Sequence, residues 1–169
     1  MIRLATNNDI KRILDITRAC TLAMDVEGVF QWNSHYPSEE VFLKDVTIGA
    51  LYVFQIKNDI CGCIMFSDEK DVPYDSVKWL TPDNHNLYIH RLAVHPNFQK
   101  QGIARSLMDF AEAFAIKHQY YSVRLDTFSQ NPRNIRFYEA RNYKQVGDVY
   151  FPKQSTFPFH CYEKVFDPQ

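Results

Sequence analysis

The chain has 169 residues, 46% of them hydrophobic, which suits one domain with a sizeable core. Nineteen basic residues face twenty acidic ones, so the net charge is −1, and this balance argues against a nucleic-acid partner, which would require a basic excess. The apolar runs are short and broken by charges, well under the ~20 residues of a membrane span, so we expect no membrane partner. The first residues lack the apolar core of an export signal, which predicts a soluble, cytoplasmic protein.

Four helices and seven strands are predicted along the chain. Apolar residues at helical spacing mark the helices, and short apolar or alternating runs mark the strands. In chain order they are a strand at 2–5, a helix to about 24, a helix from 38, strands at 51–56, 60–66 and 87–95, a helix at 102–118, a strand at 123–127, a helix from 131 to about 141, and strands near 144–150 and 159–165. Strands joined by both hairpins and helices predict an α/β (α+β mixed) fold, with a mixed sheet covered by helices, in a single domain spanning 1–169.

Capping residues support the helix starts. Thr6 with Asp9 three residues later follows the capping-box pattern, Ser38 precedes two glutamates that suit a helix N-terminus, and Asn131 with Pro132 has cap and first-turn proline in their preferred order. In the 102–118 helix, Asp109, Glu112 and Lys117 are expected on the polar side, opposite an apolar stripe. Residues 67–86 form a long polar loop without an assignable role.

The four cysteines are expected to be reduced thiols packed in the core. Cys61 and Cys63 would share one face of a strand, but a metal site needs further ligands at suitable spacing, and neither a His pair nor a second CxxC accompanies them. We therefore expect no metal. Cys161 as an acyl-carrying nucleophile lacks an obvious paired base.

The segment 92–105 carries the sharpest chemical signal. It reads as a strand, a short turn and a helix that begins at a glycine, and a helix N-terminus binds phosphate through its unpaired N–H groups and partial positive charge. Gly102 and the small Ala104 let the backbone approach a bulky anion, while Lys100 and Arg105 add positive charge. The glycine patterns of a P-loop and of a Rossmann turn are absent, and an ordinary strand–helix turn is the remaining alternative.

The pattern Gln99-x-x-Gly102-x-Ala104, which follows an apolar strand end, resembles the Q/R-x-x-G-x-G/A motif of the GNAT superfamily of acetyltransferases. Ala104 stands where a second glycine is commoner. The resemblance implies a central mixed, mostly antiparallel sheet flanked by helices, acetyl-CoA as cosubstrate, and direct acetyl transfer to a primary amine. It implies that the strand Leu92, Ala93 and Val94 pairs with the pantetheine arm, and that the pyrophosphate is held by Gln99, Lys100, Gln101, Gly102, Ile103, Ala104 and Arg105.

A second segment, Asn131 to Tyr143, is similar to the family's N-x-x-A-x-x-L/F-Y…G-F pattern, with Asn134 in place of Ala and Asn142-Tyr143 in place of Gly-Phe. The resemblance implies that Asn131 hydrogen-bonds the pantetheine region and that the Tyr138 hydroxyl lies near the thioester sulfur. Asn131 could instead be a plain helix cap, or both. Tyr138 could instead be a core aromatic.

Three groups are candidates for the proton transfers of such a reaction. Tyr138 could protonate the leaving thiolate as general acid, and a backbone N–H of residues 92–94 could polarise the thioester carbonyl. Asp126 or His90 could accept the proton of the amine. Asp126 could instead pair with Arg124 or Arg91, and His90 could be a sheet residue without a chemical role.

The irregular, aromatic segment 25–36 is where related proteins place the acceptor-binding loop. Trp32 and Tyr36 could line that site, and Asp25 and Glu27 could attract a cationic amine. Alternatively, the aromatic side chains simply anchor the loop to the core. The acceptor, a small molecule or a peptide, is not identified by the sequence. Similar proteins often form homodimers, and a binding module that holds acyl-CoA without catalysis is the alternative function.

Overall fold

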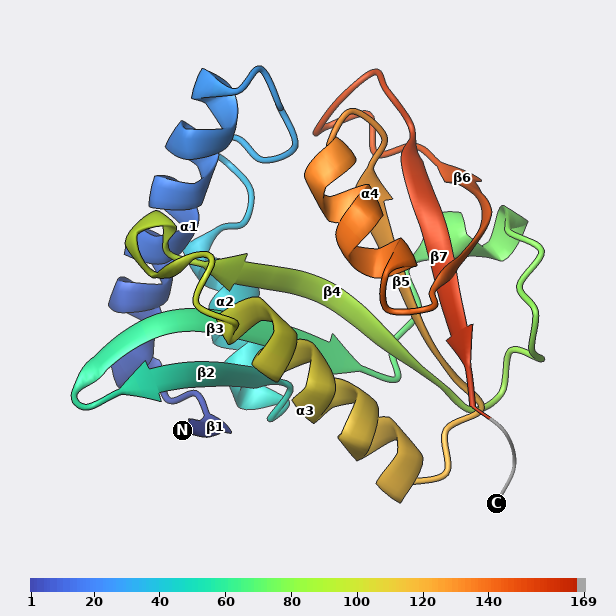
Figure 1. Cartoon of the computed structure of the whole chain (residues 1–169), viewed down its shortest axis with the longest axis horizontal. Coiled ribbons are helices and arrows are strands. Elements are labelled where there is room, and N and C mark those ends of the chain that lie inside the picture. Colours follow the sequence, from blue (N-terminus) through green and yellow to red (C-terminus); the bar gives the residue numbers. More distant parts are fainter. Residues whose placement is uncertain (167–169) are drawn as a thin grey trace. The chain divides into compact units, whose positions relative to one another are not determined.

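Residues 1–166 are described by the computed structural model, and within that range it has four α-helices and seven strands (Figure 1). The helices are α1 (Ile10–Val26), α2 (Glu39–Thr47), α3 (Ile103–Lys117) and α4 (Pro132–Glu139). The strands are β1 (Ile2–Leu4), β2 (Leu51–Ile56), β3 (Asp59–Ser67), β4 (Asn86–Val94), β5 (Ser122–Phe128), β6 (Lys144–Val149) and β7 (Phe159–Val165). Three short 3-10 turns are η1 (Asn7–Asp9), η2 (Val72–Ser76) and η3 (Pro96–Phe98).

The strands form one sheet in the order β1-β2-β3-β4-β5-β7-β6. The pairs β1–β2, β2–β3, β5–β7 and β6–β7 are antiparallel, whereas β4 and β5 run parallel. This confirms the predicted mixed, mostly antiparallel sheet flanked by helices. All predicted elements occur in the predicted order, and the chain divides into two compact units: unit 1 holds residues 1–66 and 90–111, and unit 2 holds residues 67–89 and those from 112 onward.

Local sequence signals explain the element ends. Thr6 and Asp9 form the predicted capping box, which starts η1 and leads directly into α1. β4 ends one residue earlier than predicted, because His95 already caps the η3 turn that begins at Pro96. Asn142 follows α4 with φ +67°, the left-handed conformation predicted for it.

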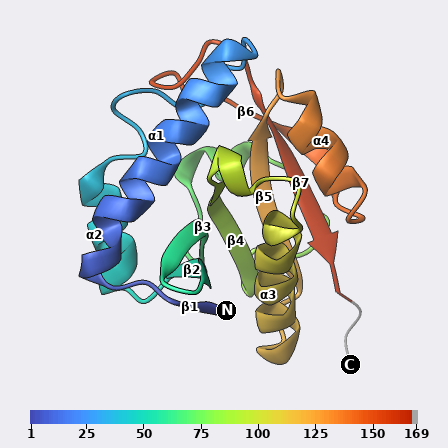
Figure 2. The ribbon, with the colours of Figure 1, turned by 60° about the vertical axis from the view of Figure 1, so that its left-hand side comes forward.

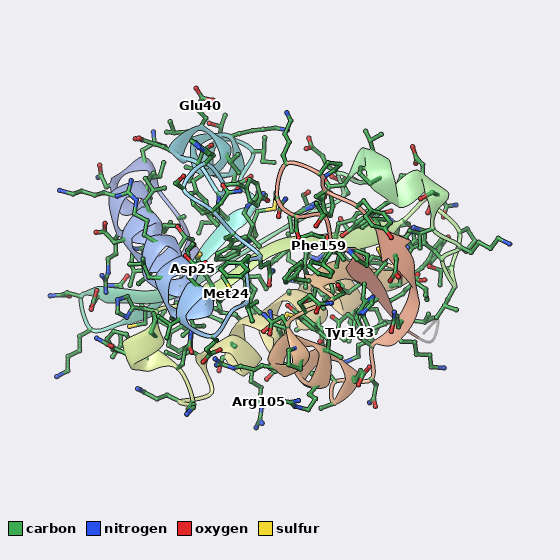
Figure 3. The ribbon with its side chains drawn as sticks, turned by 90° about the horizontal axis from the view of Figure 1, so that it is seen from above. Met24, Asp25, Glu40, Arg105, Tyr143 and Phe159 are labelled. Carbon is green, nitrogen blue, oxygen red and sulfur yellow. The ribbon has the colours of Figure 1, made fainter. Side chains whose placement is uncertain are left out.

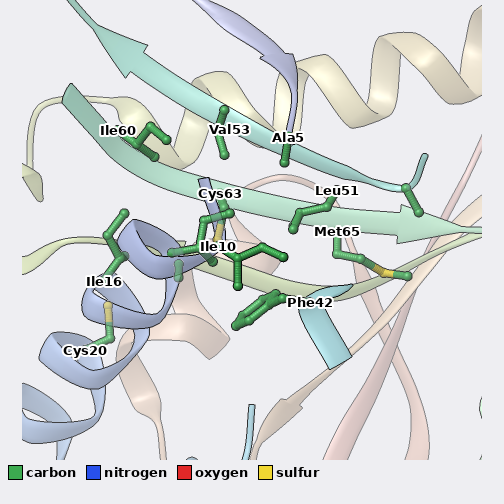
Figure 4. Packing of buried hydrophobic residues seen from close by; sticks show 13 residues of the cluster. Ala5, Ile10, Ile16, Cys20, Phe42, Leu51, Val53, Ile60, Cys63 and Met65 are labelled. Atoms are coloured by element: carbon green, nitrogen blue, oxygen red, sulfur yellow. The ribbon is translucent and has the colours of Figure 1, made fainter. Parts of the chain in front are cut away.

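In unit 1, α1 and α2 lie together on one side of β2 and β3 (Figure 2). A cluster of buried apolar side chains joins these layers (Figure 4). Its members include Ile10, Ile13 and Ile16 of α1, Phe42 of α2, Leu51 and Val53 of β2, and Cys63 and Met65 of β3. Burying each of the larger side chains stabilises the fold by about 1.5–3 kcal/mol, so this cluster fixes β3 and the strands beside it.

The opposite face of the same strands is covered by the first half of α3. Tyr52 of β2 stacks on Phe66 of β3 with ring centroids 4.8 Å apart, and Phe110 of α3 lies 4.9 Å from Tyr52. Successive strand residues point to opposite faces, so β2 serves both layers. The start of α3 is thereby held by packing as well as by its connection to β4.

In unit 2, α4 and the last turns of α3 cover one face of the strands. The Tyr162 hydroxyl of β7 donates to Glu139 of α4 at 3.3 Å, and Lys164 of β7 donates to Glu112 of α3 at 2.7 Å. Figure 1 shows α4 beside β5 and β7. Glu163, the residue of β7 between these two, points to the other face, which the segment 67–85 covers.

The sequence placed Glu112 on the polar side of its helix but did not predict its burial. Its side chain is buried and accepts hydrogen bonds from the Arg141 guanidinium at 2.9 and 3.0 Å, from the Tyr143 hydroxyl at 3.2 Å and from Lys164 at 2.7 Å. Helical periodicity identifies the apolar face, but the α4–β6 turn and β7 bury a second face through charged partners. A buried carboxylate requires such partners, because it cannot be desolvated alone.

The segment 67–85 is fastened by a buried ion pair. Arg124 of β5 is completely buried, and its Nε lies 3.0 Å from an oxygen of the equally buried Glu163 of β7. Arg124 also donates to the backbone oxygen of Thr81 at 2.5 Å, and its guanidinium lies 4.6 Å from the ring centre of Trp79. Glu163 accepts from the Thr81 hydroxyl at 2.5 Å. This long loop is therefore an ordered layer over β5 and β7.

Among residues 1–166, no helix combines the length and the apolar character that crossing a membrane demands. All four cysteines are free and buried, as expected.

Candidate active site

The connection between β4 and α3 has the geometry of an anion-binding loop. After Val94 the chain passes through η3, where the His95 side chain accepts from the Asn97 backbone N–H at 3.2 Å. Lys100 and Gly102 then adopt φ values of +62° and +81°, and α3 begins with the next residue. A side chain is rarely tolerated at such φ values, whereas glycine adopts them at no steric cost, which explains the glycine at this turn.

The amides of this loop point to no protein acceptor. Within the described part of the chain, the backbone N–H groups of residues 100–105 make no hydrogen bond to protein, and the first internal bond of the helix runs from Ser106 N to Gly102 O at 2.9 Å. The exposed side chains of Lys100 and Arg105 flank these amides, and Figure 3 shows Arg105 at the surface. Unpaired donors at a helix N-terminus, with two cations beside them, are suited to a diphosphate.

Side chains and neighbouring strands hold the loop in place. Gln99 Nε2 donates to the backbone oxygen of Val94 at 2.9 Å, and the Cys20 thiol donates to the same oxygen at 3.2 Å. The His95 N–H donates to the Cys61 oxygen of β3 at 2.9 Å. Gln99 therefore stabilises the end of β4, a positional role that is compatible with its predicted place at the cofactor.

Gly62 of β3 allows close packing under the loop. A Cβ atom on this residue would lie 2.8 Å from the Ala93 oxygen and 3.3 Å from the Ile103 side chain. Ala93 and Val94 are buried and Leu92 is half-buried. The predicted cofactor strand and the first residue of α3 are thus fixed by direct contact with β3.

Asn131 caps α4, as one of the two interpretations of its sequence predicted. Its side-chain oxygen accepts the Asn134 N–H at 3.1 Å, and the residue is buried. This fixes the first turn of the helix that carries Tyr138. The implied contact with a pantetheine arm stays a prediction.

Tyr138 lies on α4 among aromatic rings, with ring centres 5.9 Å from Tyr143 and 6.3 Å from Tyr162. It is 6% exposed, and within residues 1–166 its hydroxyl has no hydrogen-bond partner. Burial raises its pKa, and the negative charge of Asp126 raises it further, while Arg141 acts in the opposite direction. The phenol is therefore neutral and holds a proton that it can donate.

Asp126 is half-buried, whereas every other residue of β5 is buried. Its Oδ1 accepts the hydroxyl of Tyr74, from η2, at 2.5 Å. Of the two arginines that the sequence offered as partners, Arg124 pairs with Glu163 and Asp83, and Arg91 pairs with Asp45 at 2.6 Å. Asp126 is thus a carboxylate that is held by a phenol and partly accessible to a substrate.

The remaining candidates for proton transfer and acyl transfer differ in their surroundings. His90 lies half-buried on β4. Cys161 of β7 faces Asp126 across the β5–β7 pair and is completely buried. Burial raises the pKa of its thiol, and the charge of Asp126 raises it further. A neutral, enclosed thiol is a poor nucleophile, which weighs against an acyl-cysteine.

The aromatic residues of the predicted acceptor loop are both anchored within unit 1. Trp32 packs against the hydrophobic cluster of α1 and α2. The Tyr36 hydroxyl accepts from Arg91 of β4 at 3.1 Å, and Arg91 in turn pairs with the buried Asp45 of α2. The loop is therefore tied to the core, and contact of Trp32 and Tyr36 with an acceptor stays a prediction. Asp25, labelled in Figure 3, and Glu27 are exposed.

Sequence reasoning missed Tyr74. It lies in a polar segment without periodicity, and only the excess length of that segment indicated a role. No cluster of three or more His, Cys, Asp or Glu side chains that could hold a metal ion occurs in residues 1–166.

The mixed sheet and the open amides after its fourth strand define a protein that binds an acyl-coenzyme A. The Acetyltransferase (GNAT) family matches residues 10–143, and the chain belongs to this family. It is therefore an acyltransferase, and acetyl-CoA is its cosubstrate.

One relative found by sequence and two solved structures are similar to this chain. The uncharacterised N-acetyltransferase YesJ of Bacillus subtilis is 23% identical over 141 residues, covering 81% of this chain and 74% of YesJ. A GNAT-family acetyltransferase from Streptococcus agalactiae superimposes with a TM-score of 0.84 at 22% identity, covering 99% of this chain and 95% of the other. The yncA protein of Salmonella typhimurium, whose structure contains its cofactor acetyl-CoA, gives a TM-score of 0.73 at 17% identity and covers 100% and 95% of the two chains.

Proposed function

We propose that this protein transfers an acetyl group from acetyl-CoA directly to a primary amine of a small molecule or a peptide. The observation that carries this function is the row of unsatisfied backbone amides at residues 100–105. Such donors suit an anionic acceptor, and the pyrophosphate of acetyl-CoA is one. The acetyl-CoA in the yncA structure supports the same assignment.

The residues of the loop fit the cofactor that the family uses. Backbone N–H groups from Lys100 to Arg105 would hold the two phosphates, with Gly102 allowing the turn and the flanking cations adding charge. Gln99 would hold the strand end, and the exposed edge of residues 92–94 would pair with the pantetheine arm. The Val94 oxygen is already occupied by two protein donors, so we assign this pairing to the backbone of Leu92 and Ala93.

The transfer needs three events that the chain can serve. A backbone N–H of residues 92–94 polarises the thioester carbonyl as the amine nitrogen attacks it. Asp126 or His90 accepts the proton that the attacking amine loses as the C–N bond forms. Tyr138 donates its proton to the sulfur as the C–S bond breaks, and it regains a proton from water. The raised pKa of Tyr138 favours the neutral form that this step requires.

An amine panel with a thiol-release assay tests the function. Purified protein, acetyl-CoA and a thiol reagent are combined with small amines, polyamines and peptides, and isothermal titration measures acetyl-CoA binding separately. We expect measurable binding and amine-dependent release of coenzyme A. Binding without release above background across the panel would instead support a non-catalytic acyl-CoA-binding module.

The variant Tyr138→Phe tests the general acid. It removes one hydroxyl that has no partner among residues 1–166, so the fold should persist while kcat falls by about 10²-fold or more. The matched control is Tyr121→Phe, which removes an exposed phenol of unit 2 and should leave kcat unchanged. Unchanged turnover in Tyr138→Phe would remove the general-acid role.

Further proposals concern acceptor, assembly and location. Trp32 and Tyr36 line the acceptor site, and the exposed acids Asp25 and Glu27 favour a cationic amine; their replacement should raise KM for cationic acceptors only. We propose that residues 1–169 act as one acetyltransferase domain, since the family match runs through both units. A homodimer in the cytoplasm is the assembly and location we propose, to be checked by light scattering and by imaging of a tagged chain.

A further inference from the structure

The segment 67–85 places the buried phenol of Tyr74 against Asp126, the only half-buried residue of β5. Its fastening to Arg124 and Glu163 holds the segment along the face of β5 and β7 to which Asp126 also points, because residues 122, 124 and 126 alternate onto the same side. The Trp79 indole N–H donates to the backbone carbonyl oxygen of Tyr74 at 3.1 Å and fixes the backbone of η2. Tyr74 is completely buried, and its hydroxyl reaches Asp126 Oδ1 at 2.5 Å.

Besides Tyr74, Cys161 and Tyr138 are titratable groups of unit 2 that interact with this carboxylate. Cys161 lies directly opposite on β7 as a neutral thiol, and Tyr138 of α4 interacts with the same charge. Arg124 lies one step along the same face, where it pairs with the two carboxylates of Glu163 and Asp83. Tyr74 donates a hydrogen bond directly to Asp126, and its own charged neighbours include Asp71.

We propose that Tyr74 is a positioning residue, which holds the Asp126 carboxylate ionised and in one orientation so that it accepts the proton of the amine. This role rests on the proposed transfer reaction, and it gives the long β3–β4 connection a function. Tyr74 itself is enclosed and does not touch the acceptor.

The chemistry of the pair supports this role. A half-buried carboxylate with a thiol and phenols around it is poorly solvated, so desolvation favours its neutral, protonated form, which cannot accept a proton. A phenol O–H donated to the carboxylate stabilises the ionised form and fixes the carboxyl plane. Burial and the adjacent charge of Asp126 raise the pKa of Tyr74 well above its usual value, so the shared proton stays on the phenol.

The variants Tyr74→Phe and Tyr88→Phe form a matched pair. Tyr88 is also buried, its ring centre lies 5.9 Å from that of Tyr74, and its hydroxyl oxygen accepts a hydrogen bond from the Arg124 guanidinium at 3.1 Å. Both variants therefore lose one buried hydroxyl in the same aromatic cluster. Only Tyr74→Phe removes a donor from Asp126.

We expect Tyr74→Phe to shift the acidic limb of the pH profile of kcat/KM to higher pH by about one unit or more, because a hydrogen bond to a charged group is lost. Its kcat at neutral pH should fall about tenfold or more, with the Kd for acetyl-CoA unchanged. Tyr88→Phe should leave the limb in place. Asp126→Asn should slow transfer further, and adding Tyr74→Phe to it should cost little more, because the two residues act as one unit.

A measurement that needs no amine acceptor tests the positioning role of Tyr74 separately from the proposed acetyl transfer. The 13C resonance of the Asp126 carboxyl, assigned with Asp126→Asn, should titrate at higher pH in Tyr74→Phe than in the wild-type protein. If the wild-type protein acetylates no amine, the proposed function fails, while this titration still decides whether Tyr74 holds the charge of Asp126. An unchanged titration midpoint, or a wild-type pH profile in Tyr74→Phe, would overturn the positioning role.

A second variant covers the case in which Tyr74→Phe does not fold. Replacing Tyr74 by 3-fluorotyrosine keeps the shape and the hydroxyl but makes it a stronger donor. The titration midpoint of Asp126 should then move to lower pH, opposite to the change expected for phenylalanine. A midpoint that moves upward or stays unchanged would count against the role.

Discussion

Gly102→Ala isolates the contribution of the anion-binding loop. Gly102 has φ +81°, and a Cβ atom placed on it would meet nothing within 4 Å. The added methyl group therefore causes no clash, and its effect comes from the backbone conformation alone. Holding alanine in the left-handed region costs about 1–2 kcal/mol. The variant either bears this strain with the amides in place or relieves it by turning them away.

We expect the variant to relieve part of this strain by turning the amides away, because an exposed loop relaxes more readily than a packed one. A hydrogen bond to a charged group contributes about 1.5–3 kcal/mol, so misdirecting one amide should weaken acetyl-CoA binding by about ten- to hundredfold. Gly49→Ala is the matched control. Gly49 has φ +68° and is equally open, but it follows α2, outside the loop.

Isothermal titration with acetyl-CoA and urea unfolding separate the two effects. Both variants should lose similar stability, about 1–2 kcal/mol, from the left-handed backbone. Only Gly102→Ala should lose affinity. If Gly102→Ala binds acetyl-CoA as tightly as Gly49→Ala does, the amides after Gly102 do not hold the pyrophosphate.

Two further variants test the packing and the electrostatics of unit 1. Gly62→Ala would place a methyl group 2.8 Å from the Ala93 oxygen, so urea unfolding should show a loss of about 1–3 kcal/mol and titration a weaker affinity for acetyl-CoA; wild-type values for both would contradict the close approach. The Arg3 guanidinium holds the pKa of Asp9 at about 2, below its ordinary value of 3.8, so this pair stabilises the fold above about pH 4 and loses its contribution, about 2 kcal/mol, as the pH falls toward 2. Asp9→Asn should flatten the stability profile between pH 5 and 2, and a profile parallel to that of the wild-type protein would refute the pairing.

Local sequence signals predicted most of the fold. The capping residues Ser38 and Asn131 directly precede α2 and α4, and the Thr6–Asp9 capping box leads into α1. Such signals are readable in the sequence because a cap acts within three or four residues of itself. Strand alternation and the hairpin turn depend on similarly short ranges. The phosphate loop belongs to this group, since backbone amides at a helix start need only a glycine and a strand before them.

Burial of charge could not be predicted in the same way. Arg124 and Asp126 alternate with apolar neighbours, a pattern typical of a strand with one solvated face, yet Arg124 is completely buried. Its partners Glu163 and Asp83 lie 39 and 41 residues away along the chain. Glu112 was assigned to the polar side of its helix by the same kind of pattern, yet it is buried. Helical and strand periods report which face is apolar, whereas a salt bridge between distant segments depends on the tertiary fold.

The two chemical tasks of the proposed reaction differ in how they are encoded. Phosphate binding by backbone N–H groups places few demands on side chains, so a short motif is enough to find it. Proton acceptance by Asp126 depends on Tyr74, and Tyr74 depends on a loop fastened by Arg124, Glu163 and Trp79. Apart from the Trp79–Tyr74 hydrogen bond, these contacts join residues about 40 or more positions apart in the chain. A search by motif therefore recovers the cofactor loop and leaves the proton acceptor open. Variation in the segment 67–85 should accordingly alter the pH dependence of transfer before it alters cofactor affinity.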